Sequence, residues 1–165
     1  MTATVLHAAS GGEQYVTMGL GAEVFAIEIQ AVSEILDMRP IAHVPGAPSF
    51  MVGLIDVRGR SVPVIDLRLK LGMAAVAPGE QTRILVLEAA LAGRTEVIGL
   101  LVDRVFEVTE LDEVQEAEAQ EVGGRWLSDY IVGIGRRNGA FVIVFAMDRL
   151  LSDDDIVLVK RGAVR

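Results

Sequence analysis

The chain has 165 residues, enough for one domain or for two small ones that share a core, and its formal net charge is −8. This acidity argues against a nucleic-acid partner, because nucleic-acid binders usually present a basic surface. The longest unbroken apolar run, residues 140–147, is too short for direct membrane insertion, which takes about 20 residues. Cysteine is absent, which excludes disulfides and suits a cytoplasmic location.

Short β-branched runs between Gly, Pro and charged turns predict a strand-rich fold. Residues 1–12 are expected to form a flexible leader without the charged start of a secretion signal. In chain order, the first strands are expected at residues 15–20 and 24–29, and a second set at residues 84–87 and 97–102. A linker and a tight hairpin follow each set.

The second half of the chain repeats the first. Residues 24–38 align with residues 97–111 at an offset of 73, and residues 52–67 align with residues 132–147 at an offset of 80. The identities that carry the alignment are Val24 with Val97, Val32 with Val105, Glu34 with Glu107, Val52 with Val132, Gly53 with Gly133, Gly59 with Gly139, Val62 with Val142, and Val64 with Val144.

The repeat predicts one domain over residues 13–155 that consists of two barrels, at about 13–75 and 81–155. Five short strands suit each barrel, and closure of the sheet removes exposed strand edges. Whether the opening strand of one copy crosses into the other barrel stays open. Residues 107–121 carry seven acidic residues and no basic one, which predicts a solvated, mobile linker.

The C-terminal part, residues 156–165, is expected to be a helix or tail. Ser152 and Asp155 have the spacing of a capping box, which favours the start of a short helix. Val157 and Val159 are β-branched and fit a strand at least as well.

Catalytic and cofactor motifs are missing from the sequence. Only His7 and His43 could supply an imidazole base, and there is no G-x-S-x-G elbow. Residues 133–138 begin like a dinucleotide loop but lack its third glycine, and residues 153–155 lack the alternation of a calcium loop. We therefore expect no enzymatic activity, no cofactor and no bound metal.

The two predicted hairpins differ at one position. The second has Asn138-Gly139, the strongest short hairpin signal, because both residues tolerate positive φ. The first has Arg58-Gly59, in which a long cation replaces the favoured asparagine. On turn chemistry alone, a solvated arginine and a functional one are equally supported.

The run at residues 53–68, GLIDVRGRSVPVIDLR, resembles the signature of the CheW domain family, G-V-x-N-L-R-G-x-x-V-P-V-I-D-L-R. Residues 15–29, 32–35, 98–103 and 130–135 extend the resemblance over nearly the whole chain. It implies a mostly all-β fold of two SH3-like five-stranded barrels packed side by side, with short helices in linkers and at the C-terminus.

The resemblance also implies a function. If the resemblance holds, the chain would be a non-enzymatic adaptor. It would couple the cytoplasmic tips of chemoreceptors, the methyl-accepting chemotaxis proteins, to the regulatory domain of a CheA-type histidine kinase. It would be cytoplasmic, peripheral to membrane-bound receptor arrays through protein contacts, and monomeric or weakly self-associating when isolated. Carried over by motif position, the receptor-binding groove includes Ile29, Val32, Arg58, Val105 and Gly133, and the kinase contact includes Glu34, Ile35 and Leu36.

Some interpretations stay open. Val32 and Val105 would face each other across the groove by pseudo-symmetry, although core packing fits them equally well. Asp56 replaces the family's usual asparagine and could pair with Arg58, and the acidic segment before Tyr130 puts ring formation with the kinase in doubt. An adaptor of a pilus or cyclic-dinucleotide pathway fits the same sequence. A nucleic-acid or ligand-binding barrel is disfavoured by the eight aromatic residues and the acidic charge.

Overall fold

The computed structural model describes residues 13–91, 93–116 and 130–163. These residues form eleven β-strands and four short helices. The predicted leader, residues 1–12, lies outside the described residues. The strands are β1 (Tyr15–Leu20), β2 (Glu23–Glu28), β3 (Val32–Asp37), β4 (Met51–Val57), β5 (Arg60–Asp66), β6 (Arg83–Leu91), β7 (Arg94–Val102), β8 (Arg104–Thr109), β9 (Asp112–Glu116), β10 (Ile131–Arg137) and β11 (Ala140–Phe145). The helices are η1 (Ile29–Ala31), α1 (Leu67–Lys70), α2 (Met147–Leu150) and α3 (Asp153–Ala163).

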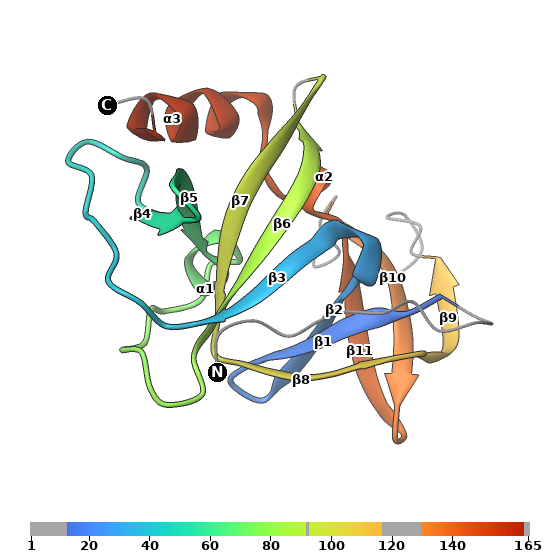
Figure 1. Cartoon of the computed structure of the whole chain (residues 1–165). Helices are drawn as coiled ribbons and strands as arrows, with labels where there is room; N and C mark the ends of the chain where they lie inside the picture. The colour runs from blue at the N-terminus through green and yellow to red at the C-terminus, as the bar shows by residue number, and fades with distance from the viewer. Residues whose placement is uncertain (1–12, 92, 117–129, 164–165) are drawn as a thin grey trace.

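The strands form two sheets that lie side by side (Figure 1). Sheet A has five strands in the order β3-β6-β7-β5-β4, and sheet B has six in the order β8-β1-β2-β11-β10-β9. The mostly β fold that the sequence predicts is confirmed. Sheet B carries one strand more than the predicted five, because β9 pairs with β10 along part of the acidic segment.

The strand register reproduces the sequence repeat. Val64 of β5 pairs in parallel with Gly99 of β7, and Val144 of β11 pairs in parallel with Ala26 of β2. The offset of 80 relates Val64 to Val144, and the offset of 73 relates Ala26 to Gly99, so the two pairs are equivalent in the repeat. The third strands also match, because the β3–β6 and β8–β1 ladders both shift register beside the equivalent valines, Val32 and Val105. The repeated sequences therefore fold into repeated units.

The sheets are not divided as predicted. Sheet A is built from residues 32–102, whereas sheet B combines residues 15–28 with residues 104–145. The predicted barrels at about 13–75 and 81–155 are therefore wrong in composition. The reason is that η1 follows β2 where a hairpin turn would fold the chain back, so β3 continues into sheet A and pairs with β6. The chain returns to sheet B at Asp103, where β8 pairs with β1.

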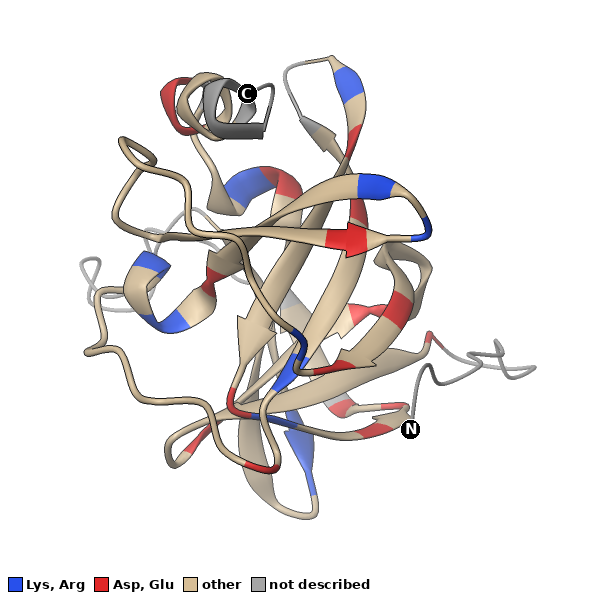
Figure 2. Ribbon diagram, turned by 60° about the vertical axis from the view of Figure 1, so that its left-hand side comes forward, with Lys and Arg blue, Asp and Glu red and all other residues tan. Residues whose placement is uncertain are grey.

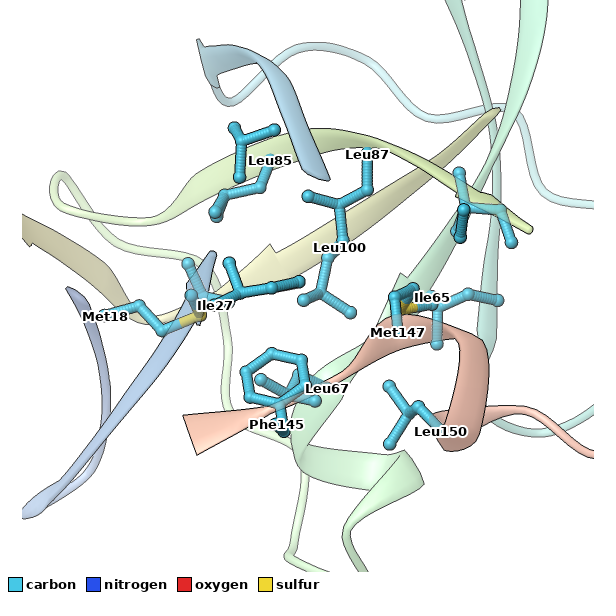
Figure 3. Packing of buried hydrophobic residues seen from close by; sticks show 14 of the residues in the cluster. Met18, Ile27, Ile65, Leu67, Leu85, Leu87, Leu100, Phe145, Met147 and Leu150 are labelled. Carbon is cyan, nitrogen blue, oxygen red and sulfur yellow. The ribbon is translucent and has the colours of Figure 1, made fainter. Parts of the chain in front are cut away.

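Alternation along β6 shows how the core is divided. Ile84 and Val86 point into the cluster inside sheet A, whereas Leu85 and Leu87 join the larger cluster shared by both sheets. Figure 3 shows this shared cluster, in which side chains of both sheets and of α2 meet. Phe145 of β11 also packs edge to face on Phe25 of β2, with ring centroids 6.3 Å apart. The two sheets therefore bury their most apolar faces against each other.

The C-terminal helix and the acidic segment differ from the predictions in their extent. Helix α3 begins at Asp153, earlier than the predicted 156, and the predicted capping box is present. Ser152 Oγ accepts a hydrogen bond of 3.1 Å from Asp155 N, and Asp155 Oδ2 accepts one of 3.0 Å from Ser152 N. The acidic residues 107–116 belong largely to β8 and β9 and not to a mobile linker, and residues 117–121 lie outside the described part.

Candidate partner-binding site

Arg58 occupies a strained position at the tip of the β4–β5 hairpin. Its φ is 54°, and Asn138 at the equivalent tip of the β10–β11 hairpin has a φ of 51°. These are the non-glycine residues with positive φ in the part of the chain that the structure describes. Asparagine tolerates this left-handed conformation, whereas an arginine there costs free energy. The hairpin therefore has arginine at a place where turn chemistry favours another residue.

Arg58 forms an ion pair with Glu34 of β3, with 2.7 Å between Nη2 and Oε1. The Arg58 side chain stays 77% exposed, whereas the Glu34 side chain is only 12% exposed. The pair brings together one residue predicted for the receptor groove and one predicted for the kinase contact. The guanidinium has five N–H donors, so the ion pair leaves it able to donate to a partner.

Asp56 does not take the role that the sequence left open for it. Its Oδ1 accepts a hydrogen bond of 2.8 Å from Gly59 N and so closes the turn, while the guanidinium of Arg58 reaches Glu34. The backbone carbonyl of Asp56 also accepts a bond of 3.2 Å from Arg39 Nη1. The carboxylate that replaces the usual asparagine therefore stabilises the hairpin.

The other predicted groove residues lie mostly in the shared core. Ile29 and Val32 are 6% and 7% exposed and belong to the cluster between the sheets, and Val105 is half-buried against the same cluster. Gly133 is buried beneath β9, where an added Cβ would lie 3.1 Å from the carbonyl oxygen of Gln115. Among these residues, Arg58 and Val105 keep side-chain surface for a partner.

The predicted kinase contact has a similar division. Ile35 and Leu36 are 4% and 3% exposed and pack on opposite faces of sheet A, in the shared cluster and in the internal cluster. Glu34 lies between the sheet and Arg58. Since β3 is an edge strand of sheet A, its backbone is unpaired on one side within the described sheet.

A second charged network, which the sequence did not predict, lies where the chain passes from sheet A to sheet B at Asp103. Arg68 of α1 donates from Nε and Nη2 to the two carboxylate oxygens of Asp103, at 2.8 and 2.6 Å. Asp103 also accepts 2.8 Å from Gly21 N. The hydrogen bond from Arg68 lowers the pKa of Asp103 below its ordinary value, outweighing the opposing effect of burial. Arg68 belongs to the family-like run, but its partner is distant in the chain.

Charged residues of both signs are spread over the described part of the molecule. Lys and Arg segments are interspersed with Asp and Glu segments over the ribbon (Figure 2). Within the described ranges, no group of three His, Asp or Glu side chains could hold a metal ion, and His43 is exposed in a loop. No helix in the described part of the chain is long and apolar enough to cross a bilayer.

Comparison with known proteins identifies the fold. Residues 14–155 match the family model described as the CheW-like domain. The chain is 30% identical over 162 residues to the chemotaxis protein CheW of Klebsiella aerogenes, covering 98% of this chain and 95% of that relative. It is 25% identical over 155 residues to the chemotaxis protein CheW of Rhizobium meliloti, covering 94% of this chain and 97% of that relative.

The solved structures include a similar fold. The crystal structure of the scaffolding protein TtCheW from Thermoanaerobacter tengcongensis matches with a TM-score of 0.74 at 26% identity, over 88% of this chain and 96% of that chain. The two sheets described above are thus the two SH3-like barrels that the resemblance implied. Because the family model and the Klebsiella relative both span most of its length, the chain belongs to the CheW-like domain family, a family of non-enzymatic scaffold proteins.

Proposed function

We propose that this protein couples the cytoplasmic tips of chemoreceptors to a CheA-type histidine kinase in chemotaxis. The observation that carries the proposal is Arg58, which is 77% exposed and held by Glu34 in a turn that favours asparagine. Membership in a scaffold family and the names of the chemotaxis relatives support this function. The protein contributes binding free energy and geometry to the signalling assembly, and no chemistry.

The receptor surface would lie along Arg58, whose side chain is 77% exposed, and Val105, which is half-buried. Ile29 and Val32 are buried in the shared cluster and would support this surface from within. Gly133 is buried between β9 and β11, so it would act by shaping β10. An apolar ridge of a receptor helix would pack on the valine, while the guanidinium donates to a carboxylate or carbonyl at the rim. The interface would therefore be modest in size and centred on one arginine.

The kinase surface lies along the edge strand β3. Glu34 is 12% exposed and would act there through its ion pair with Arg58. The buried side chains of Ile35 and Leu36 hold the strand against the two clusters. An exposed strand edge can also receive a strand of the partner through main-chain hydrogen bonds. The protein would work in the cytoplasm, peripheral to membrane-bound receptor arrays, and would be monomeric or weakly self-associating when isolated.

Co-sedimentation tests the function directly. Receptor-containing membranes are incubated with the kinase, with or without this protein, and the kinase in the pellet is measured. The protein is expected to enter the pellet with the receptors and to increase the amount of kinase there. The proposal would be contradicted if the protein stayed in the supernatant. If it also bound a single-stranded oligonucleotide in a column assay, the nucleic-acid-binding alternative would be supported.

A further inference from the structure

A pocket of about 380 Å³ opens where β2, β6 and the β11–α2 connection meet, so both sheets line it. Its floor is apolar and includes the buried side chains of Ile27, Phe145 and Met147, which Figure 3 shows at the sheet junction. Pockets of about 300–1,000 Å³ are typical of ligand sites. None of the residues assigned to the receptor groove or to the kinase contact lines this pocket.

The sequence repeat supplies an internal comparison for this pocket. Ala31, on its wall, aligns with Arg104 at the offset of 73. Glu88 aligns with Gly19, because Val97 pairs with Glu88 in the same way that the equivalent Val24 pairs with Gly19. The counterpart of the pocket therefore lies around Gly19, at the other junction of the sheets.

Arg104 fills that counterpart. A Cβ on Gly19 would lie 2.9 Å from Arg104 Nε and 3.1 Å from Arg104 Cζ, so the arginine lies flat on the strand where glycine leaves room. Its Nη2 donates 2.5 Å to the carbonyl oxygen of Gly21. The ion pair of Arg68 with Asp103 lies beside it and also contacts Gly21. One junction of the fold is thus occupied by an arginine of the chain itself.

The pocket has the opposite charges. Ala31 stands in place of Arg104, Asp148 in place of Arg68, and Glu88 in place of Gly19. Glu28, Glu88 and Asp148 are exposed at its mouth, against one cation, Arg149. Among the residues that the structure describes, no ion pair engages these three carboxylates. In the counterpart, Arg104 of the chain itself fills the space and supplies the positive charge. The pocket has neither, so it can accept a cationic group of another molecule.

We propose that this pocket receives an arginine side chain from a protein partner. The guanidinium would lie where Arg104 lies in the counterpart, with the Ala90 carbonyl in the role of Gly21 and with Glu88 and Asp148 as carboxylate acceptors. Planar donors of arginine match a carboxylate in a bidentate way, which the point charge of lysine does not. The aliphatic stem packs on the apolar floor. The site shares no lining residue with the two surfaces of the proposed function, although Ala31 is the chain neighbour of Val32.

The test uses a peptide probe and its neutral isostere. The ¹⁵N-labelled full chain is titrated with acetyl-Leu-Arg-Leu-amide and with acetyl-Leu-citrulline-Leu-amide, and amide shifts are followed by NMR. The arginine peptide is expected to shift Ala31, Ala90 and Asp148, with a Kd about tenfold lower than that of the citrulline peptide. Equal affinities, or shifts confined to other surfaces, would overturn the proposal.

Two variants separate filling of the pocket from a change of net charge. Ala31→Arg supplies the arginine that the counterpart has, and it is expected to abolish binding of the peptide. Ala22→Arg adds the same charge in the exposed β1–β2 turn and is expected to bind the peptide like the unsubstituted chain. Equal effects of the two substitutions would contradict a defined pocket. The last titration uses free L-arginine, whose α-carboxylate should be repelled by the acidic pocket and should raise its Kd above that of the peptide. A Kd equal to that of the peptide would indicate a small-molecule site and overturn the docking role.

Discussion

Glu34 and Arg58 form an ion pair that joins the edge strand β3 to the hairpin on the opposite side of sheet A. The second copy has a matching pair, in which Glu107 of β8 contacts Arg137 of the β10–β11 hairpin at 2.6 Å. The two glutamates are equivalent in the repeat, whereas the two arginines differ by one position. Bridging the two sides of the barrel is therefore a shared feature, and only the first copy has its arginine at the tip.

Replacement of Arg58 by alanine should change stability little and binding more. An ion pair with a 77% exposed partner contributes about 0–1 kcal/mol, so the free energy of unfolding in urea should fall by no more than that. Loss of a charge-assisted contact at the interface should weaken receptor binding by about 1–3 kcal/mol. Co-sedimentation with receptor membranes measures the second effect. Unchanged receptor binding would show that Arg58 is a solvated turn residue without a role in the contact.

Arg58→Asn separates the turn from the contact. Asparagine is the residue of the second hairpin at the equivalent φ, so the variant should be as stable as the unsubstituted chain or more stable by up to about 1 kcal/mol. It lacks the guanidinium and should lose receptor binding as Arg58→Ala does. Thermal unfolding and co-sedimentation of the same preparation provide the comparison. An asparagine variant that binds fully would show that turn geometry alone matters.

Val32→Met tests the residue that the sequence left between core and groove. Val32 is 7% exposed in the shared cluster, so the longer side chain should overpack it and cost about 1–3 kcal/mol in the free energy of unfolding. Val105→Met is the matched control, because Val105 is half-buried and has room toward solvent. Its cost should be smaller. Equal stability of the Val32 variant and the unsubstituted chain would mean that Val32 faces an open groove.

Gly53→Ala should be more damaging than Gly133→Ala, although the two glycines align. A Cβ on Gly53 would overlap the carbonyl oxygen of Ala42, which is held by the paired hydrogen bonds between Ala42 and Leu54. A Cβ on Gly133 would lie 3.1 Å from the carbonyl oxygen of Gln115, which a small shift of β9 relieves. Urea unfolding should show a loss above about 2 kcal/mol for Gly53→Ala and a smaller one for Gly133→Ala. The reverse order would contradict this geometry.

Arg68→Met should destabilise the fold in a pH-dependent way. The side chains of Arg68 and Asp103 are 14% and 17% exposed, so removal of the cation leaves a partly buried carboxylate and should cost about 2 kcal/mol at pH 7. The pKa of Asp103 is lowered in the folded chain, so its contribution is fully present above the unfolded value near 3.9 and is lost as pH falls through the folded pKa. The difference between the two proteins in urea unfolding should therefore shrink below about pH 4. A difference independent of pH would show that Arg68 acts by packing alone.

The sequence predicted the features that depend on neighbouring residues. The hairpin glycines, the capping box at Ser152 and the alternation of strands are local, and the repeat itself is visible by alignment. Beyond the two hairpins, it did not reveal which strands pair. Whether β3 folds back on β2 or continues to β6 depends on the three residues of η1 and on apolar faces far apart in the chain.

Only part of the candidate site could be predicted, because its contacts also join residues that are far apart in the chain. The unusual turn residue, Arg58, is visible when the two hairpins are compared, but its partner Glu34 is on a strand reached only through the fold. The burial of Ile35 and Leu36 also could not be read from the sequence, because neighbouring residues of one strand face different clusters. Residues 107–116 have the acidic composition of an exposed linker, yet they belong largely to the edge strands β8 and β9. Composition could not distinguish the two, because edge strands tolerate charged side chains.

The crossings at η1 and Asp103 have a consequence for the behaviour of the whole molecule. Each sheet needs strands from both halves of the repeat, so a cut in the exposed connection between α1 and β6 would leave two fragments that are each incomplete. Such fragments would have to reassemble with each other to recover either barrel. The two barrels are interlaced by the chain itself, and they should unfold together as one cooperative unit.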